Sequence, residues 1–184
     1  MKAFDRVLQR WRVAKARRYI PAGARLLDIG CADGTLLRTL GASLRSGVGV
    51  DPSLHERSEH GGVVLLPGRF PESVPEGEAF DVITLLAVLE HVPRADQPDW
   101  ARACAERLAP GGLVVVTVPS HFVDPILFVL KSLRIIDGMG IEEHYGFRGS
   151  MTEPLFANAG FRLVRHQRFQ GGLNHLFVFQ KTPA

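Results

Sequence analysis

The sequence is short of cysteine and of long hydrophobic runs. Its 184 residues include two cysteines, Cys31 and Cys104, which lie far apart. A disulfide framework needs more cysteines, so a reducing, cytoplasmic setting is expected. No group of cysteines and histidines has metal-ligand spacing, so no metal is expected. No run approaches the roughly 18 apolar residues of a membrane-spanning helix. Arg6, Arg10 and Arg12 interrupt the start, so no signal peptide is expected.

Acidic residues are scarce near the start, where the chain is strongly basic. The formal net charge is +3, and seven basic residues precede position 19 against one acid, Asp5. Of the 22 basic and 19 acidic residues in the chain, 15 and 18 remain beyond that point. Local basicity of this kind disfavours a nucleic-acid-binding protein and leaves an acidic substrate or a membrane surface open.

Apolar residues recur at helical spacing over residues 3–19, with arginines on the other faces. This pattern predicts an amphipathic helix that ends before Pro21 and Gly23. Further helices are expected at about residues 34–40, 97–108 and 151–159. Strands are expected at residues 25–29, 47–50, 63–66, 80–86, 113–118, 161–168 and 175–180.

This alternation of strands and helices predicts a doubly wound α/β fold. The sheet should be mostly parallel and seven-stranded, with an antiparallel C-terminal hairpin. Neither a linker nor an internal repeat divides the chain, so a single domain over residues 1–184 is expected.

The most informative stretch is the apolar strand, glycine turn and helix over residues 26–37. Gly30 and Gly34 lack side chains, so a ligand can approach the backbone closely, and the helix start offers N–H groups to an anion. Asp51 ends the next strand, 21 residues after Gly30, where an acid can accept hydrogen bonds from ribose hydroxyls. The alternatives are a plain connecting turn and a capping aspartate.

The run from Gly30 reads G-C-A-D-G, which lacks the G-x-G-x-x-G spacing of an NAD-linked dehydrogenase. It resembles the first motif of class I S-adenosylmethionine (SAM)-dependent methyltransferases, acid-x-G-x-G-x-G. Asp28, Gly30 and Gly34 match, and Ala32 replaces the middle glycine. Residues 80–92 and 108–113 are similar to later motifs of the subgroup that includes ubiquinone and menaquinone methylases and many small-molecule methyltransferases.

The resemblance implies SAM as cofactor and a Rossmann-like fold. It places Gly30, Cys31 and Gly34 at the methionine end of SAM and Asp51 at its ribose. The other implied cofactor contacts are Asp28, Pro52, Ser53, Gly68, Arg69, Phe70, Leu85 and Leu86. Arg69 stands where the family usually has an acid for the adenine amino group. An arginine cannot accept that hydrogen bond, so either a backbone carbonyl does so or the alignment shifts there.

Methyl transfer from a sulfonium depends chiefly on holding the acceptor close and aligned. An oxygen acceptor would also benefit from a general base. The candidates are His91, His121, His144 and Tyr145, each of which is alternatively a surface or packing residue. The absence of an obvious base leaves a second hypothesis, a SAM-binding regulatory or partner protein without turnover.

Two segments offer an acceptor surface. Residues 120–149 interrupt the alternation with an apolar centre and then glycines, which predicts either a packed helix or a lid over an apolar, lipid-like acceptor. The N-terminal helix, residues 1–20, either caps the cofactor or lies on a membrane surface with Phe4 and Trp11 inserted. The acceptor's identity and the oligomeric state stay open.

Overall fold

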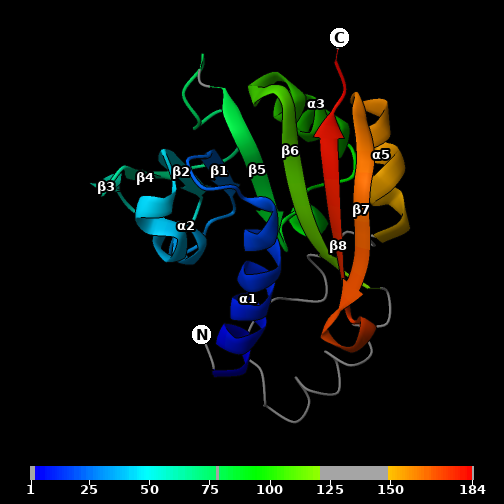
Figure 1. The fold of residues 1–184 in the computed structure, drawn as a ribbon, viewed down its shortest axis with the longest axis horizontal. Coiled ribbons are helices and arrows are strands. Elements are labelled where there is room, and N and C mark those ends of the chain that lie inside the picture. The colour runs from blue at the N-terminus through cyan, green and yellow to red at the C-terminus, as the bar shows by residue number, and fades with distance from the viewer. Residues whose placement is uncertain (1–2, 78, 121–148, 184) are drawn as a thin grey trace.

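The computed structural model describes residues 3–77, 79–120 and 149–183, which contain an eight-stranded sheet. Its strand order is β3-β4-β2-β1-β5-β6-β8-β7 (Figure 1). The strands are β1 (Arg25–Ile29), β2 (Ser46–Asp51), β3 (Ser58–His60), β4 (Val63–Pro67), β5 (Phe80–Leu86), β6 (Leu108–Pro119), β7 (Phe161–Phe169) and β8 (Asn174–Lys181). β1, β2, β4, β5 and β6 are parallel, and β8 runs antiparallel to both its neighbours. The prediction of a mostly parallel, Rossmann-like sheet with an antiparallel C-terminal hairpin is confirmed.

Helices cover both faces of this sheet (Figure 1). α1 (Ala3–Ala16) and α2 (Thr35–Leu40) lie on one face, and α3 (Gln97–Arg107) and α5 (Thr152–Asn158) lie on the other. The helix expected over 3–19 ends its α-helical part at Ala16 and continues as one 3₁₀ turn, η1 (Arg17–Tyr19). Another 3₁₀ turn, η3 (Leu89–His91), follows β5.

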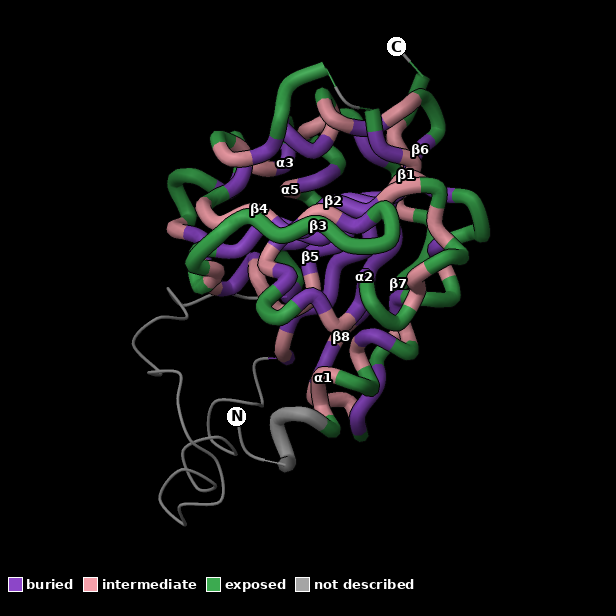
Figure 2. Tube along the Cα trace, turned by 90° about the vertical axis from the view of Figure 1, so that its left-hand side faces the viewer, coloured by how far each residue is buried: buried purple, intermediate pink, exposed green. Residues whose placement is uncertain are grey.

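The expected strand count of seven was wrong, because β3 forms an eighth strand. β3 pairs antiparallel with β4 and is exposed along its whole length (Figure 2). Its three polar residues carry no alternating pattern, as is common in short, charged edge strands. The missed signal was the pair Gly61-Gly62, whose φ angles of 59° and 79° make the tight hairpin turn.

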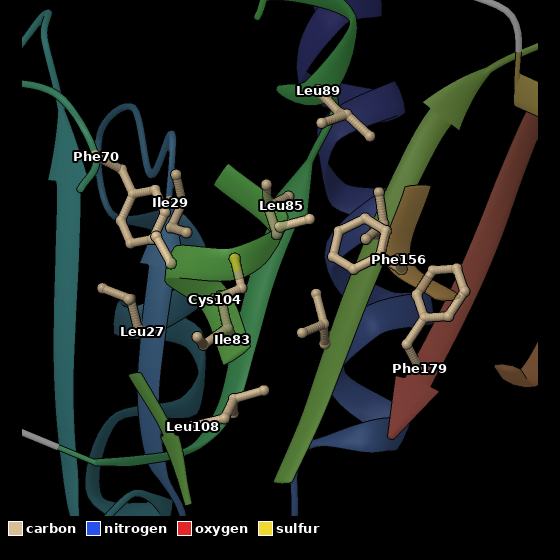
Figure 3. Close-up of a cluster of buried hydrophobic side chains, with 14 of the residues drawn as sticks. Leu27, Ile29, Phe70, Ile83, Leu85, Leu89, Cys104, Leu108, Phe156 and Phe179 are labelled. Carbon is tan, nitrogen blue, oxygen red and sulfur yellow. The ribbon is translucent and has the colours of Figure 1, made fainter. Parts of the chain in front are cut away.

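The core lies on both faces of the central strands. In β1, Leu27 and Ile29 pack with α3 and α5 in one cluster, while Leu26 packs with α1 and α2 in the other. Figure 3 shows the first cluster, which extends to Phe156 and Phe179. Burial on two faces explains why the part of β6 from Leu113 to Val118 is apolar at all but one position rather than alternating. Among the described residues, no helix is long and apolar enough to span a membrane.

Candidate functional site

The loops that follow β1 and β5 meet at the centre of the sheet. The chain leaves β1 for β2 on one side and later returns to β5 on the other, so β1 and β5 flank a topological switch point. Ligands of open α/β sheets bind outside the carboxyl ends of strands at such a point. The contact is tight, because a Cβ added to Gly30 would lie 2.3 Å from Val88 Cγ2. Gly30 has φ +71°, so the backbone also favours glycine there.

Packing within the protein thus explains these glycines at least as directly as ligand approach does. A Cβ on Gly34, which has φ +74°, would come within 3.0 Å of the Leu65 side chain. The start of α2 is also less open than expected. Asp33 Oδ1 accepts hydrogen bonds from the Thr35 backbone N at 3.2 Å and from Thr35 Oγ1 at 2.6 Å. The backbone N–H of Thr35, one of the groups expected to bind an anion at the helix start, therefore already has a partner within the protein.

Asp51 connects the first two strands through its carboxylate. Its Oδ2 accepts a hydrogen bond from the Ala32 backbone N at 2.8 Å. Its Oδ1 accepts from the backbone N of Ser53 at 2.8 Å and from Ser53 Oγ at 2.6 Å. The Asp51 side chain is 9% exposed, so the carboxylate is held in one orientation at the carboxyl end of β2. The Asp51 backbone oxygen accepts from the Gly68 N at 3.2 Å, which brings the end of β4 to the same place.

Strained backbone marks both central loops. Ala32, after β1, has φ +47°, and Ala87, after β5, has φ +61°. A side chain in this left-handed region costs of order 1–3 kcal/mol and persists only where the surroundings enforce it. Such residues cluster at binding sites, and these two lie at adjacent strand ends.

A buried acid lies directly beneath the first loop. Asp28 is 3% exposed in β1, and its Oδ1 accepts a 2.6 Å hydrogen bond from Thr84 Oγ1 of β5. Burial raises the pKa of Asp28 to about 7, although the Thr84 hydrogen bond opposes this and nearby Asp51 adds to it. Thr84 was not among the expected site residues. The available signal was a single hydroxyl in the otherwise apolar part of β5 beyond Asp81.

A second buried acid, Glu90, lies in η3 beyond the end of β5. It is 3% exposed, and its Oε2 has no hydrogen-bond partner. Burial raises the pKa of Glu90 to about 7, against the lowering effects of its own backbone N–H and of Arg12 in α1. Sequence reasoning named the motif but nominated its neighbour His91, which is half-buried. The missed signal was an acid within the apolar run 82–92.

The remaining implied residues fall into two groups, one at the surface and one in the core. Pro52, Ser53 and Arg69 are exposed, and Leu86 is half-buried, so all four have surface near the carboxyl edge. The side chains of Cys31, Phe70 and Leu85 are at most 4% exposed and belong to the core. Phe70 packs edge-to-face on Trp100 with ring centroids 5.3 Å apart. Burial raises the pKa of the Cys31 thiol, which therefore stays protonated.

Three of the four base candidates, His121, His144 and Tyr145, lie outside the described residues. So does nearly all of the expected lid, since only Ser120 and Gly149 of residues 120–149 are described. Both of these residues are buried. The Ser120 backbone N donates to the Leu173 oxygen at 2.8 Å, which ties the end of β6 to the β7–β8 connection.

Comparison with known proteins decides the family. A family model described as a methyltransferase domain matches residues 2–177. The chain belongs to this family. The methyltransferase resemblance is confirmed, and with it SAM as the cofactor that the family and its structural neighbours indicate. An NAD-linked dehydrogenase is therefore not supported.

Curated relatives share about a third of their matched residues with the chain. A ubiquinone biosynthesis O-methyltransferase of Rhizobium etli (strain CIAT 652) is 35% identical over 102 residues, which are 51% of this chain and 40% of the relative. The same-named protein of Parvibaculum lavamentivorans is 29% identical over 151 residues, 76% of this chain and 59% of the relative. The chain thus spans less than two thirds of the length of these relatives.

The fold is shared more widely than the sequence. The crystal structure of the N-methyltransferase NodS from Bradyrhizobium japonicum WM9 matches 95% of this chain and 97% of its own. The TM-score is 0.70 at 15% identity. This likeness establishes the fold. The molecule that is methylated has to be inferred from the chemistry of the site.

Proposed function

We propose that this protein transfers a methyl group from SAM to an oxygen atom of an apolar, lipid-like small molecule. The observation that carries the proposal is the oriented carboxylate of Asp51 at the end of β2, beside the two loops at the switch point. The names of the curated relatives, which act in ubiquinone biosynthesis, support the acceptor class.

The residues at this edge fit SAM. Among the described residues, Asp51 Oδ2 accepts only the Ala32 N–H, so it has room for one ribose hydroxyl. Oδ1 already accepts two hydrogen bonds from Ser53, and a second ribose hydroxyl would replace that of Ser53 Oγ. The glycine turn at Gly30 brings backbone, rather than side chains, to the edge next to that carboxylate. The exposed Arg69 offers no acceptor to the adenine amino group, which leaves that hydrogen bond to a backbone carbonyl.

SAM supplies the activated methyl group, so the protein's task is to bind, align and exclude water. The β1 loop, held by Asp51, would bind the cofactor. Leu86, Ala87 and Val88 are all half-buried at the end of β5 and would present an apolar wall to the acceptor. An apolar wall with few polar groups suits a hydrophobic small molecule better than a charged one. His91 remains the candidate base within the described residues, and His121, His144 and Tyr145 remain candidates beyond them.

The first test measures SAM affinity by calorimetry for the parent and for Asp51→Asn. Loss of the charged acceptor from two ribose hydrogen bonds should cost roughly 2–4 kcal/mol, or about 30- to 1000-fold in affinity. Asp51→Asn keeps the size of the side chain. Glu59→Gln on exposed β3 is the matched control and should bind SAM like the parent. Unchanged affinity in Asp51→Asn would refute this cofactor site.

The second test separates catalysis from binding without turnover. The purified protein is incubated with methyl-labelled SAM and a series of prenylated catechols and phenols of rising chain length. The proposal expects labelled product whose yield rises with the apolar chain. SAM binding without any labelled product would instead favour a regulatory or partner protein.

A further inference from the structure

The outward side of α1 and η1 carries apolar residues that the described part of the chain leaves uncovered. The Val7 and Trp11 side chains are 53% and 54% exposed. Val7, Trp11 and Ala14 follow one another at spacings of four and three, so they form one stripe along the helix. Two large apolar side chains exposed side by side make a contiguous patch, and such patches on folded domains mark surfaces that bind another molecule.

Three arginines border the same stripe. Arg10, Arg17 and Arg18 are exposed, and their positions continue the helical spacing of Val7 and Trp11. Among the residues that the structure describes, no acidic side chain forms a salt bridge with any of them. We call the set Val7, Arg10, Trp11, Ala14, Arg17 and Arg18 the outer face of α1.

The opposite side of α1 fixes the helix beside the carboxyl edge of the sheet. Val13 and Ala16 are buried in the core. The Leu8 backbone oxygen accepts a 3.2 Å hydrogen bond from Gln170 Nε2, and the Gln9 side chain helps to lower the pKa of Asp33 in the β1 loop, which places the two side chains near each other. In Figure 1 the N-terminal half of α1 extends along the sheet toward the ends of β5 and β6. The outer face therefore points to solvent right beside the candidate site.

We propose that the outer face of α1 binds the surface of an anionic lipid bilayer. Val7 and Trp11 would enter the boundary between headgroups and acyl chains, where tryptophan is favoured, and the arginines would contact lipid phosphates. The charge distribution supports this occupant, because the chain beyond position 18 carries 18 acidic against 15 basic residues. An anionic membrane attracts the outer face and repels the rest, which orients the protein. A nucleic acid fits less well, because a single exposed aromatic and three arginines on a convex helix make no stacking groove.

This orientation brings the carboxyl edge of the sheet close to the bilayer. An apolar acceptor dissolved in the membrane would then reach the site without crossing water. The membrane proposal goes beyond methyl transfer and stands without it, because vesicle binding requires neither SAM nor an acceptor.

Co-sedimentation with vesicles of phosphatidylcholine, with and without phosphatidylglycerol, tests the proposal on the full chain. The parent should sediment with the anionic vesicles and be released by salt. Arg10→Gln/Arg17→Gln/Arg18→Gln should weaken binding about 100-fold, and Val7→Ser/Trp11→Ser at least about 10-fold. The matched control is Val164→Ser/Arg165→Gln on β7, where an equally exposed valine lies next to an arginine. It should bind like the parent, and all variants should keep the parent's circular dichroism.

Fluorescence gives an independent readout, because the chain has two tryptophans. Trp100→Phe leaves Trp11 as the only one. Its emission should shift to the blue with anionic vesicles and not with neutral ones. The proposal is overturned if no shift occurs, or if the α1 variants bind like the control. It is also overturned if the protein is a dimer that Val7→Ser/Trp11→Ser dissociates without any vesicle binding, or if only nucleic acid binds the outer face.

Discussion

The two loops at the centre of the sheet differ in the way they are stabilised. The loop after β1 is polar and tied down, with Ala32 bonded to Asp51 and Thr35 bonded to Asp33. The loop after β5 is apolar up to Glu90, whose Oε2 lacks a partner. The first arrangement is fixed before any ligand arrives, as a polar cofactor needs. The second loop supplies half-buried apolar residues next to the buried acid Glu90. This arrangement suits an apolar binding partner rather than a polar cofactor.

The contact between these loops should give the largest effect of any single substitution. Gly30→Val places a branched side chain at φ +71° against Val88. We expect a loss of about 3 kcal/mol or more in the free energy of unfolding, and no SAM binding. Urea denaturation and calorimetry measure the two effects.

Gly23→Ala is the matched control for this substitution. Gly23 has φ +76° with nothing near its added Cβ, so it should lose only about 1–2 kcal/mol, the cost of a left-handed alanine. A second comparison isolates the clash, because Gly30→Ala should be partly rescued by Val88→Ala. Equal stability of Gly30→Val and Gly23→Ala would show that the loops do not meet as described.

Sequence patterns placed the glycines and the aspartate of the polar loop at the ends of β1 and β2, but they could not separate edge residues from core residues around the apolar loop. Gly30, Gly34 and Asp51 were identified because backbone conformation and ribose chemistry each demand particular residue types. Leu85 illustrates the difficulty: the family resemblance implied a cofactor contact there, and in the structure the residue lies within β5 and is completely buried. In a parallel sheet both faces are apolar, so hydrophobicity alone cannot tell a residue that lines the edge from one that fills the core.

The buried acid under the polar loop should make stability depend on pH. The unfolded chain loses the Asp28 proton above pH of about 4, whereas the folded protein keeps it until about pH 7. Stability contributed by this group is therefore lost as pH rises through that window. Asp28→Asn keeps an oxygen for Thr84 and removes the titration. Relative to the parent, it should gain a few kcal/mol between pH 4 and pH 7, measured by urea denaturation at each pH.

Thr84→Val sharpens this prediction. It removes the hydrogen bond that favours the charged form of Asp28, so the loss of stability with rising pH should continue above pH 7, where that of the parent levels off. A parallel loss at every pH would mean that Asp28 does not titrate in this window.

Removal of Glu90, the acid of the apolar loop, should change the pH dependence of the free energy of unfolding less than removal of Asp28 does. Glu90→Gln removes a group whose pKa burial raises to about 7 even though Arg12 opposes the rise. Because the Glu90 pKa rises from 4.5 to about 7 and that of Asp28 from 3.8 to about 7, we expect a gain with rising pH of about three quarters that of Asp28→Asn, measured by urea denaturation at each pH. A gain larger than that of Asp28→Asn would reverse the comparison of the two loops.

The smallest effect is expected at the other end of the same strands. Arg25 Nη2 contacts Asp81 Oδ1 at 2.9 Å, and its guanidinium holds the pKa of Asp81 below its usual range. Both side chains are more than a third exposed, so solvent weakens the pair. Asp81→Asn should lower the thermal midpoint by no more than about 3 °C at pH 7, and the difference should vanish as the pH falls below 3. A much larger drop in the thermal midpoint would show that the Arg25–Asp81 pair contributes more to stability than an exposed ion pair does.

The position of β8 between β6 and β7 has a consequence for synthesis on the ribosome. β7 is made before β8 but touches the sheet only through it, so β7 has no place to bind until β8 has emerged. Until then the apolar edge of β6 stays open to any extended chain nearby, including another nascent copy. Completion of the sheet therefore waits for β8, and the interval before β8 emerges is the one in which a chaperone would be most useful to the protein.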